Sequence, residues 1–394
     1  MILERDFPPD DRPEKEALSL IEAGYEVYLL CFTWSDKPVE ENYKGITIVR
    51  FKISRRTYKK LSPTYLMLPF YRMLWSPQIE SFIKKYDINI IHIHDLPMTD
   101  IAIRVAEKYK CKVVCDQHEY WSNWIINTAH YNTLPGKIVK ALSPWEKYER
   151  KYLGKADLVI TVSNPLRECY LSKVGINPSK IITVPNTPSR AVFKKENIKK
   201  DIVEKYKNNF ILFYAGAIDI LRGLDVVLNS LAKLEKKIPH IKFLIAGRIS
   251  KNYNILKLAK EKKVDHLIEF TGWLEINELP SYIEASDICL FTPYFKHDEI
   301  NNTIATKIFQ YLAMHKPIIT SYAKMMHEFV VNNGLGSAID PDKPNEFIEA
   351  VLNLYNNYSA LSAEIIKNSI NLINSQNVFW DQTIQPLLHE YSKL

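Results

Sequence analysis

Short apolar runs alternate with longer amphipathic stretches along the chain, and this alternation occurs twice. In the first half, apolar runs of strand length lie at 26–31, 46–51, 88–93, 112–115, 158–162 and 181–184. Helical patterns separate them at 14–23, 99–109, 137–152 and 165–174. In the second half, strand-like runs lie at 210–215, 242–246, 268–271, 288–291 and 317–320, again with helical patterns between them. Apolar strands separated by helices of this length indicate parallel sheets covered by helices on both faces.

The two series predict two doubly wound, Rossmann-like α/β domains. A chain of 394 residues is too long for one ordinary core and suits two domains of roughly 150–200 residues. The stretch 191–207 is rich in Lys and Asn, so we expect it to link a domain at 1–190 to another at 208–375. A final helix is expected at 376–394, with room to cross back to the first domain. Because such folds bind ligands at the carboxyl ends of their strands, we expect the two domains to face a central cleft.

Several classes of protein are excluded by motifs that the sequence lacks. No strand is followed by Gly-x-Gly-x-x-Gly, and no P-loop sequence occurs, which argues against the common dinucleotide and nucleoside-triphosphate sites. The five cysteines form no Cys-x-x-Cys pair, as expected for reduced thiols rather than disulfides or zinc ligands. No apolar stretch approaches the ~20 residues of a membrane span, and the first residues lack a signal-peptide pattern. We therefore expect a cytoplasmic protein.

The positive charge of the chain belongs to its first half. Residues 1–200 hold 32 Lys+Arg and 23 Asp+Glu, a net charge of +9, whereas residues 201–394 have a net charge of −2. The densest basic stretch contains Arg55, Arg56, Lys59 and Lys60, and an aromatic segment at 65–75 follows it. This pattern suits an acceptor site or a peripheral contact with the inner, anionic face of a membrane. A helix packed on its own domain with solvated lysines is the alternative, and no nucleic-acid-binding module is recognisable.

Two segments of the second half carry residues suited to phosphate binding. A strand ends at Gly216, and Arg222 and Gly223 follow where the next helix begins. A glycine lets a ligand approach the backbone, and a helix N-terminus beside a guanidinium can hold a diphosphate. Further along, Thr303, Lys307 and Gln310 recur at helical spacing and share one face.

Two strands of the first half end in titratable residues. The strand over 88–93 runs into His94 and Asp95, and the next strand runs into Asp116, His118 and Glu119. In a two-domain fold these strand ends would face Arg222 and Lys307 across the cleft.

Together these segments resemble glycosyltransferase family 4, the retaining, nucleotide-sugar-dependent enzymes of GT-B fold. The residues at 7–17 look like the family's opening loop and first helix, and Asp116-Gln117-His118-Glu119 looks like its Asp-x-His-Glu loop. The pairs Val162-Ser163 and Pro185-Asn186 fit two further landmarks, and Gly216 with Arg222-Gly223 fits the phosphate loop. The segment 306–319 is the most specific match. The resemblance covers nearly the whole chain.

The resemblance implies transfer of a sugar from a nucleoside diphosphate donor with retention at the anomeric carbon, and with no metal or other cofactor. His118 would contact the donor sugar, and Asp95 or Glu119 would orient it or meet the acceptor, which would be a glycan or a lipid-linked intermediate of surface polysaccharide synthesis. The remaining implied donor residues are Gly216, Arg222, Gly223, Gly272, Trp273, Asn302, Thr303, Ile304, Ala305, Thr306, Lys307 and Gln310.

The chain departs from the family pattern at several positions. Asn302 and Gln310 stand where the family commonly has two glutamates, and an amide can bind hydroxyls but supplies no negative charge. Ala217 replaces an arginine, and His315 replaces the glycine that usually ends the helix. Only residues 1–3 precede the opening loop, so the first strand is short or frayed. A catalytically degenerate sugar-nucleotide or glycan binder and a nucleotide-sugar epimerase therefore stay open as alternatives.

Overall fold

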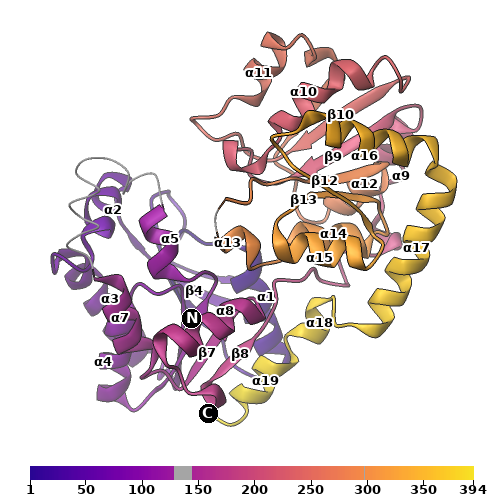
Figure 1. The fold of residues 1–394 in the computed structure, drawn as a ribbon. Helices are drawn as coiled ribbons and strands as arrows, with labels where there is room; N and C mark the ends of the chain where they lie inside the picture. The colour runs from indigo at the N-terminus through magenta and orange to yellow at the C-terminus, as the bar shows by residue number, and fades with distance from the viewer. Residues whose placement is uncertain (128–143, 297) are drawn as a thin grey trace. The chain divides into compact units, whose positions relative to one another are not determined.

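The computed structural model describes residues 1–127, 144–296 and 298–394. These form two compact units, which Figure 1 shows from one side. Unit 1 comprises Met1–Pro185 together with Ile384–Leu394, and unit 2 comprises Asn186–Thr383. The last eleven residues therefore group with the first part of the chain. Residues 137–143 of the helix expected over 137–152 lie outside the described residues.

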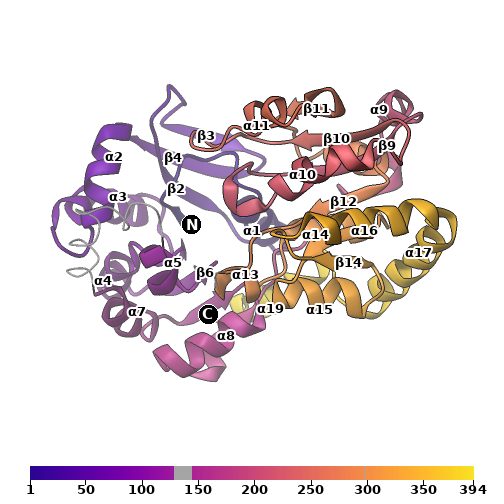
Figure 2. The same cartoon turned by 45° about the horizontal axis from the view of Figure 1, so that its top comes forward.

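Unit 1 is built on an eight-stranded sheet in the order β3-β4-β2-β1-β5-β6-β7-β8. Its strands are β1 Ile2–Leu3, β2 Tyr28–Thr33, β3 Glu40–Tyr43, β4 Ile46–Lys52, β5 Ile90–His94, β6 Lys112–Gln117, β7 Leu158–Thr161 and β8 Ile181–Thr183. All neighbouring pairs are parallel except β3 and β4, which Figure 2 shows beside β2. The first strand is short, as expected, with two residues, but it is not frayed, because β1 is buried between β2 and β5.

The helices of unit 1 cover this sheet. They are α1 Asp11–Glu22, α2 Arg55–Leu61, α3 Phe70–Lys85, α4 Thr99–Tyr109, α5 Trp121–Asn127, α7 Trp145–Leu153, α8 Asn164–Cys169 and α19 Gln385–Tyr391. Two begin at serines that cap them: Ser54 accepts a hydrogen bond from the Thr57 amide, and Ser163 accepts one from Leu166. The core combines β2, β5 and β6 residues with the buried faces of α3 and α4.

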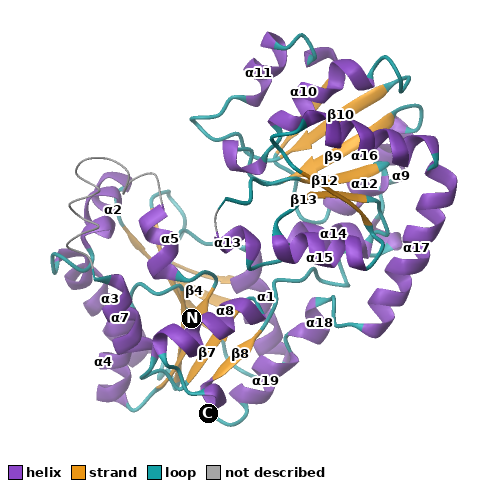
Figure 3. Ribbon diagram, in the orientation of Figure 1, coloured by secondary structure: helices purple, strands orange, loops and turns teal. Residues whose placement is uncertain are grey.

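Unit 2 is built on a six-stranded parallel sheet in the order β11-β10-β9-β12-β13-β14. Its strands are β9 Phe210–Ala215, β10 Ile241–Ala246, β11 Ile268–Gly272, β12 Ile288–Phe291, β13 Ile318–Ser321 and β14 Gly336–Ile339. Figure 3 shows these strands in orange with purple helices around them. The fold class predicted from the alternating pattern is confirmed in both units, each of which is an α/β parallel-sheet structure.

The helices of unit 2 include one in the segment that was expected as a linker. They are α9 Lys200–Tyr206, α10 Asp225–Leu234, α11 Ile255–Glu261, α12 Leu279–Glu284, α13 Asp298–Asn301, α14 Thr306–Ala313, α15 Lys324–Asn332, α16 Pro344–Asn356, α17 Tyr358–Ser375 and α18 Trp380–Thr383. Within 191–207, Phe193 and Tyr206 are buried in the core of unit 2. Two anchoring aromatic residues thus tie a largely polar segment to the domain that follows it.

His315 follows the end of α14, at the position where a glycine is usual. Met314 is the last residue before the chain turns, and His315 adopts φ 55°, the left-handed conformation that favours glycine. The His315 amide donates to the Leu312 carbonyl at 2.9 Å, which closes the helix. The structure therefore keeps the usual helix ending with a residue that strains it.

We expect His315→Gly to be more stable than His315→Ala by about 1 kcal/mol, because only glycine adopts this conformation without strain. Urea unfolding of the two variants measures the difference in their free energies of unfolding. Both variants lack the imidazole, so its lost contacts cancel in the comparison. Equal stability of the two variants would contradict the assigned backbone strain.

Candidate active site

Two adjacent strands of unit 1 deliver its titratable residues to one edge of the sheet. In the parallel pair β5 and β6, His92 lies opposite Val114 and His94 lies opposite Asp116. Both strands end at the same level, so Asp95 and His118 follow side by side. The structure thus brings together the two groups of residues that the sequence placed at strand ends.

His118 lies between two carboxylates at this edge. Its Nε2 is 2.9 Å from Asp116 Oδ2, and its Nδ1 is 3.5 Å from Asp95 Oδ1. Burial disfavours the charged imidazole, but Asp116 and Asp95 outweigh that effect and raise the pKa of His118 to about 9. The side chain is 20% exposed, which leaves part of the ring open to a ligand.

Asp116 is held by Arg12, a residue of α1 that the sequence analysis did not single out. The guanidinium donates from Nε to Oδ2 at 2.8 Å and from Nη2 to Oδ1 at 2.9 Å, so the contact is bidentate. Its third nitrogen donates to the Val184 carbonyl at 2.9 Å. Burial opposes ionisation of Asp116, yet Arg12 and His118 hold its pKa well below the usual range.

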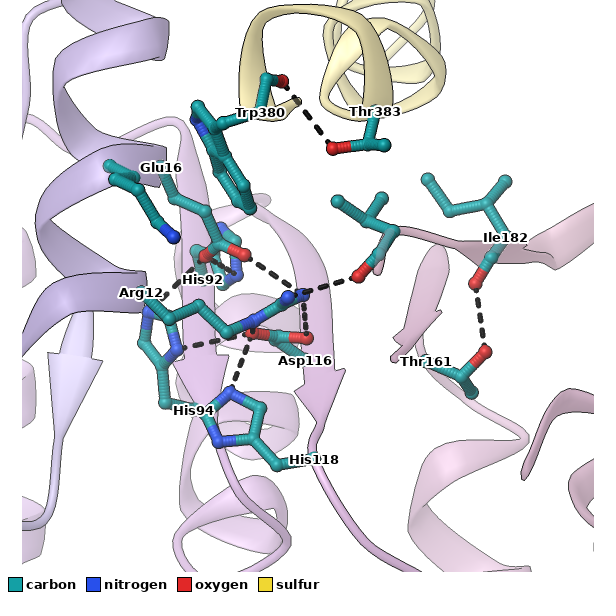
Figure 4. A network of polar contacts seen from close by, with 12 residues as sticks. Arg12, Glu16, His92, His94, Asp116, His118, Thr161, Ile182, Trp380 and Thr383 are labelled. Atoms are coloured by element: carbon teal, nitrogen blue, oxygen red, sulfur yellow. Dashed lines mark hydrogen bonds and ion pairs between the residues drawn. The ribbon is translucent and has the colours of Figure 1, made fainter. Parts of the chain in front are cut away.

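A buried polar cluster, defined here as Glu16, His92 and His94, lies behind this pair. Figure 4 shows these side chains pointing toward Arg12 and Asp116. Burial raises the pKa of Glu16 to about 8 and lowers the pKa of both histidines, which favours the neutral form of each. Tyr391 of α19 contacts His92 Nδ1 at 2.6 Å, which links the C-terminal helix to the cluster.

Together with Asp116, the cluster has the residue types that bind metal ions. Single ligand atoms of Glu16, His92, His94 and Asp116 lie within 4.8 Å of one another. However, Arg12 contacts both carboxylates, at 3.0 Å for Glu16 and 2.8 Å for Asp116. We therefore interpret Glu16 and Asp116 as partners of Arg12, and the expectation of a site without metal stays a prediction.

Asp95 and Glu119 differ in how firmly the structure places them. Asp95 adopts φ 67°, an uncommon conformation for a non-glycine residue, and its Oδ2 is 2.5 Å from the Arg5 guanidinium. Arg5 also contacts Asp10 at 3.0 Å and was another residue that the sequence analysis missed. For Glu119 the described contact is through its backbone carbonyl, which accepts from Tyr170 at 3.0 Å. The role proposed for its side chain stays a prediction.

In unit 2, Lys307 lies directly over Gly216. A Cβ atom added to Gly216 would fall 2.3 Å from Lys307 Cε and 2.6 Å from its Nζ, so a side chain there would displace the end of Lys307 from this position. Burial, with a smaller effect from Arg222, lowers the pKa of Lys307 to about 8. Lys307 therefore meets Gly216, which lies far from it in sequence, at the carboxyl edge of the sheet, and Arg222 lies near enough to affect its pKa.

Arg222 belongs to a short turn that precedes α10 rather than to the helix itself. The turn spans Ile220–Arg222, and Asp219 caps it by accepting from the Leu221 amide. The Arg222 Nε lies 3.3 Å from Asp219 Oδ2, and the side chain is 30% exposed. Gly223 follows with φ 63°, and a Cβ there would fall 2.0 Å from the Thr292 carbonyl oxygen. The glycine thus packs the turn against the end of β12.

The other predicted donor residues occupy neighbouring loops of unit 2. Residues 303–305 are an extended segment leading into α14, whose first residue is Thr306. Gln310 is buried in α14, whereas Asn302 is exposed. After β11, Trp273 is 51% exposed, and the Arg248 guanidinium lies 4.4 Å from its ring centre. Arg248 carries no sequence signal beyond its place two residues after β10.

The basic segment of unit 1 is exposed, and the aromatic segment after it is partly buried. Arg55, Arg56, Lys59 and Lys60 are all exposed on α2. Of the aromatic segment after them, Tyr65, Tyr71 and Trp75 are buried in the core, whereas Leu68, Phe70 and Met73 are exposed. Among helices in the described part of the chain, none has the length and apolar character needed to cross a bilayer.

The turn between β14 and α16 has the sequence Asp340-Pro341-Asp342. Asp340 accepts a hydrogen bond from the Asp342 amide at 3.0 Å, an arrangement typical of a turn.

Both halves of the chain match known families. Residues 16–187 match the family described as "Glycosyltransferase Family 4", and residues 195–372 match "Glycosyl transferases group 1". The chain belongs to the group 1 glycosyltransferases of family 4. The family match of residues 195–372 includes Gly216, Arg222, Lys307 and Gln310, and that of residues 16–187 includes Asp95, Asp116, His118 and Glu119.

Individual relatives of this glycosyltransferase are distant. An uncharacterized glycosyltransferase of Methanocaldococcus jannaschii is 23% identical over 61% of the chain, and a chitobiosyldiphosphodolichol beta-mannosyltransferase of Candida albicans is 24% identical over 72%. These alignments cover 58% and 62% of the relatives' own lengths. An alpha-monoglucosyldiacylglycerol synthase of Streptococcus pneumoniae is 20% identical over 84% of the chain and 71% of its own length.

Solved structures of similar shape are GT-B glycosyltransferases. A sucrose-phosphate synthase of Thermosynechococcus elongatus has a TM-score of 0.75 at 15% identity, covering 100% of this chain and 97% of its own. Anabaena HepE, solved with UDP-glucose, has a TM-score of 0.69 at 14% identity, covering 100% and 98%. These likenesses confirm the predicted GT-B fold class.

The contact between Gly216 and Lys307 gives a direct test of the donor edge. Gly216→Ala would drive a methyl group into the Lys307 side chain at a backbone conformation of φ 145°, so we expect destabilisation by at least about 2 kcal/mol. Gly175→Ala is the matched control, because Gly175 also has a positive φ but nothing within 4 Å. We expect it to cost only about 1 kcal/mol in thermal unfolding. Equal losses would contradict the combination of strained backbone and close contact assigned to Gly216.

Proposed function

We propose that the protein is a retaining glycosyltransferase, of the hexosyltransferase type, that uses a nucleoside diphosphate sugar. The observation that carries this proposal is that Lys307 meets Gly216 at the carboxyl edge of the unit 2 sheet, with Arg222 near enough to affect the pKa of the lysine. Ligands of doubly wound folds bind at that edge. Support comes from the GT-B neighbour solved with UDP-glucose, which binds a donor of this class.

The chemistry of the transfer explains why two cations are needed. As the glycosidic bond to the donor breaks, negative charge develops on the leaving diphosphate. Arg222 and Lys307 would stabilise this charge, and the extended residues 303–305 would present the start of α14 to the same phosphates. With two cations from the chain itself, we propose a metal-independent reaction. Because the pKa of Lys307 is about 8 without a ligand, a bound diphosphate would also keep it fully charged.

The remaining donor and sugar contacts follow from the positions of the side chains. Gln310 would bind the ribose hydroxyls, and Gly272 with Trp273 would frame the base. His118, Asp95 and Glu119 of unit 1 would meet the donor sugar or the acceptor. Asn302 would contribute hydrogen bonds only, since an amide carries no charge.

For the acceptor, we propose a glycan or a lipid-linked intermediate of surface polysaccharide synthesis, handled on the cytoplasmic side of a membrane. The relatives include enzymes named for a diphosphodolichol-linked and a diacylglycerol-linked substrate. The exposed basic residues of α2, beside exposed Leu68, Phe70 and Met73, supply both attractions that a peripheral membrane site uses.

A panel of UDP-, GDP- and dTDP-sugars tests the activity, with release of nucleoside diphosphate and the anomeric configuration of the product as readouts. We expect turnover with one donor class and retention in the product. Nucleotide binding without turnover would instead establish the degenerate binder that Asn302, Gln310 and Ala217 suggest. Release of a free epimer without any acceptor would establish the epimerase.

Removing the Arg222 guanidinium should weaken nucleoside diphosphate binding. We expect Arg222→Ala to raise the Kd for the preferred nucleotide by roughly 10- to 150-fold, equivalent to ~1.5–3 kcal/mol for a lost charge-assisted hydrogen bond. Isothermal calorimetry measures this, with Lys233→Ala on the exposed face of α10 as the control. An unchanged Kd in Arg222→Ala would refute the assignment.

Neutralising Arg55, Arg56, Lys59 and Lys60 to Gln should abolish binding to vesicles that contain anionic lipid, because each basic residue near such a surface contributes about 1 kcal/mol. Flotation measures the bound fraction. Four exposed lysines of unit 2, Lys257, Lys260, Lys262 and Lys263, provide a control variant with the same change of charge. Undiminished flotation of the α2 variant would reject the membrane site.

A further inference from the structure

The charge state of His118 follows from what its two ring nitrogens face. Nε2 contacts Asp116 at 2.9 Å, and Nδ1 faces Asp95 at 3.5 Å. An ionised carboxylate only accepts hydrogen bonds, whereas a neutral imidazole has one nitrogen without a proton. A neutral His118 would therefore point a lone pair at one of the two carboxylates. Only the doubly protonated ring satisfies both.

Each of the two carboxylates contacts its own guanidinium. Arg12 binds Asp116 through two hydrogen bonds, and Arg5 contacts Asp95 at 2.5 Å. Asp10 contacts Arg5 in turn, so three carboxylates and three cations alternate along Asp10, Arg5, Asp95, His118, Asp116 and Arg12. A cationic His118 balances this chain of charges, and a neutral one would leave it with a net negative charge.

The other groups packed against His118 do not compensate its charge. The His94 ring lies 5.8 Å from the His118 ring, and Glu16 faces Arg12 and both buried histidines. Burial raises the pKa of Glu16 and lowers the pKa of His94, which favours the neutral form of each, and the nearby Arg12 opposes a positive charge on His118. Among the described groups, Asp116 and Asp95 are the carboxylates that favour the cationic ring.

We infer that Asp116 and Asp95 hold His118 as a doubly protonated imidazolium, so that His118 serves the site as a fixed positive charge and not as a general base. Asp116 is the positioning residue. A general base needs a free lone pair, and both ring nitrogens of His118 already carry a proton. In the proposed transfer, on which this part of the inference rests, the charge would stabilise an anionic oxygen of the bound ligand. Activity would then fall as the pH rises through the pKa of about 9, rather than rise near 6.5.

Nitrogen NMR of the imidazole side chains tests this without any substrate. In protein labelled with ¹⁵N-histidine, the His118 signals, assigned by their loss in His118→Gln, should show two protonated nitrogens at pH 7.5. We expect Asp116→Asn and Asp95→Asn each to lower the titration midpoint of His118 by about one pH unit or more. Asp265→Asn, an exposed site in unit 2, should leave it unchanged.

The outcomes separate this inference from the proposed activity. A neutral His118 at pH 7.5, or a midpoint unaffected by Asp95→Asn, would overturn it. Asp95 is partly exposed, so its variant gives a result even if the buried change at Asp116 prevents folding. A cationic His118 in a protein without turnover would support the charge state and refute the glycosyltransferase activity.

Discussion

The buried ion pair of Arg12 and Asp116 is the interaction on which the active edge of unit 1 depends. It joins α1 to β6 through two hydrogen bonds, and through the Val184 carbonyl it reaches the end of β8. Removing one partner of such a pair costs about 3–5 kcal/mol, because the other charge is left buried and unpaired. The position of His118 rests on the same carboxylate. A change at this ion pair would therefore affect both the stability of unit 1 and the position of His118.

In unit 2, the residues of the carboxyl edge are positioned by the space that glycines leave rather than by a buried ion pair. Its carboxyl edge is shaped by glycines that allow close approach, and Gly216 leaves room for Lys307. The lysine is kept partly desolvated over the Phe291 ring, with Nζ 5.1 Å from the ring centre. Such a cation has lost water that an anionic ligand would replace. One unit thus presents a charge-balanced edge, and the other presents an edge with unsatisfied positive charge.

Much of the fold was predictable because apolar runs and helical periodicity are properties of neighbouring residues. The strands β9 and β12 occupy the residues that their apolar runs predicted, and the other predicted strands differ by one or two residues at one or both ends. The two-residue β1 has no periodicity to detect, and it forms through pairing with β2 and β5. Helix α9 was missed because its segment is polar, and its burial rests on Tyr206 and the nearby Phe193.

The site was predictable in so far as it follows from strand ends and family motifs. His118, Arg222 and Lys307 were found in this way. Arg12 was not, because its partner lies 104 residues away and an arginine in a first helix carries no signal of burial. The same holds for Arg5 and Arg248, whose partners are set by tertiary packing.

The proposed function requires a nucleoside diphosphate sugar to bind at the carboxyl edge of the unit 2 sheet. Hydrogen–deuterium exchange of the full chain, with and without saturating nucleotide from the UDP, GDP and dTDP series, measures where the nucleotide binds. We expect protection at 216–223 and 303–310 with the preferred nucleotide, and little change in α11 or α17. Protection confined to other segments, or none with any of the three nucleotides, would contradict it.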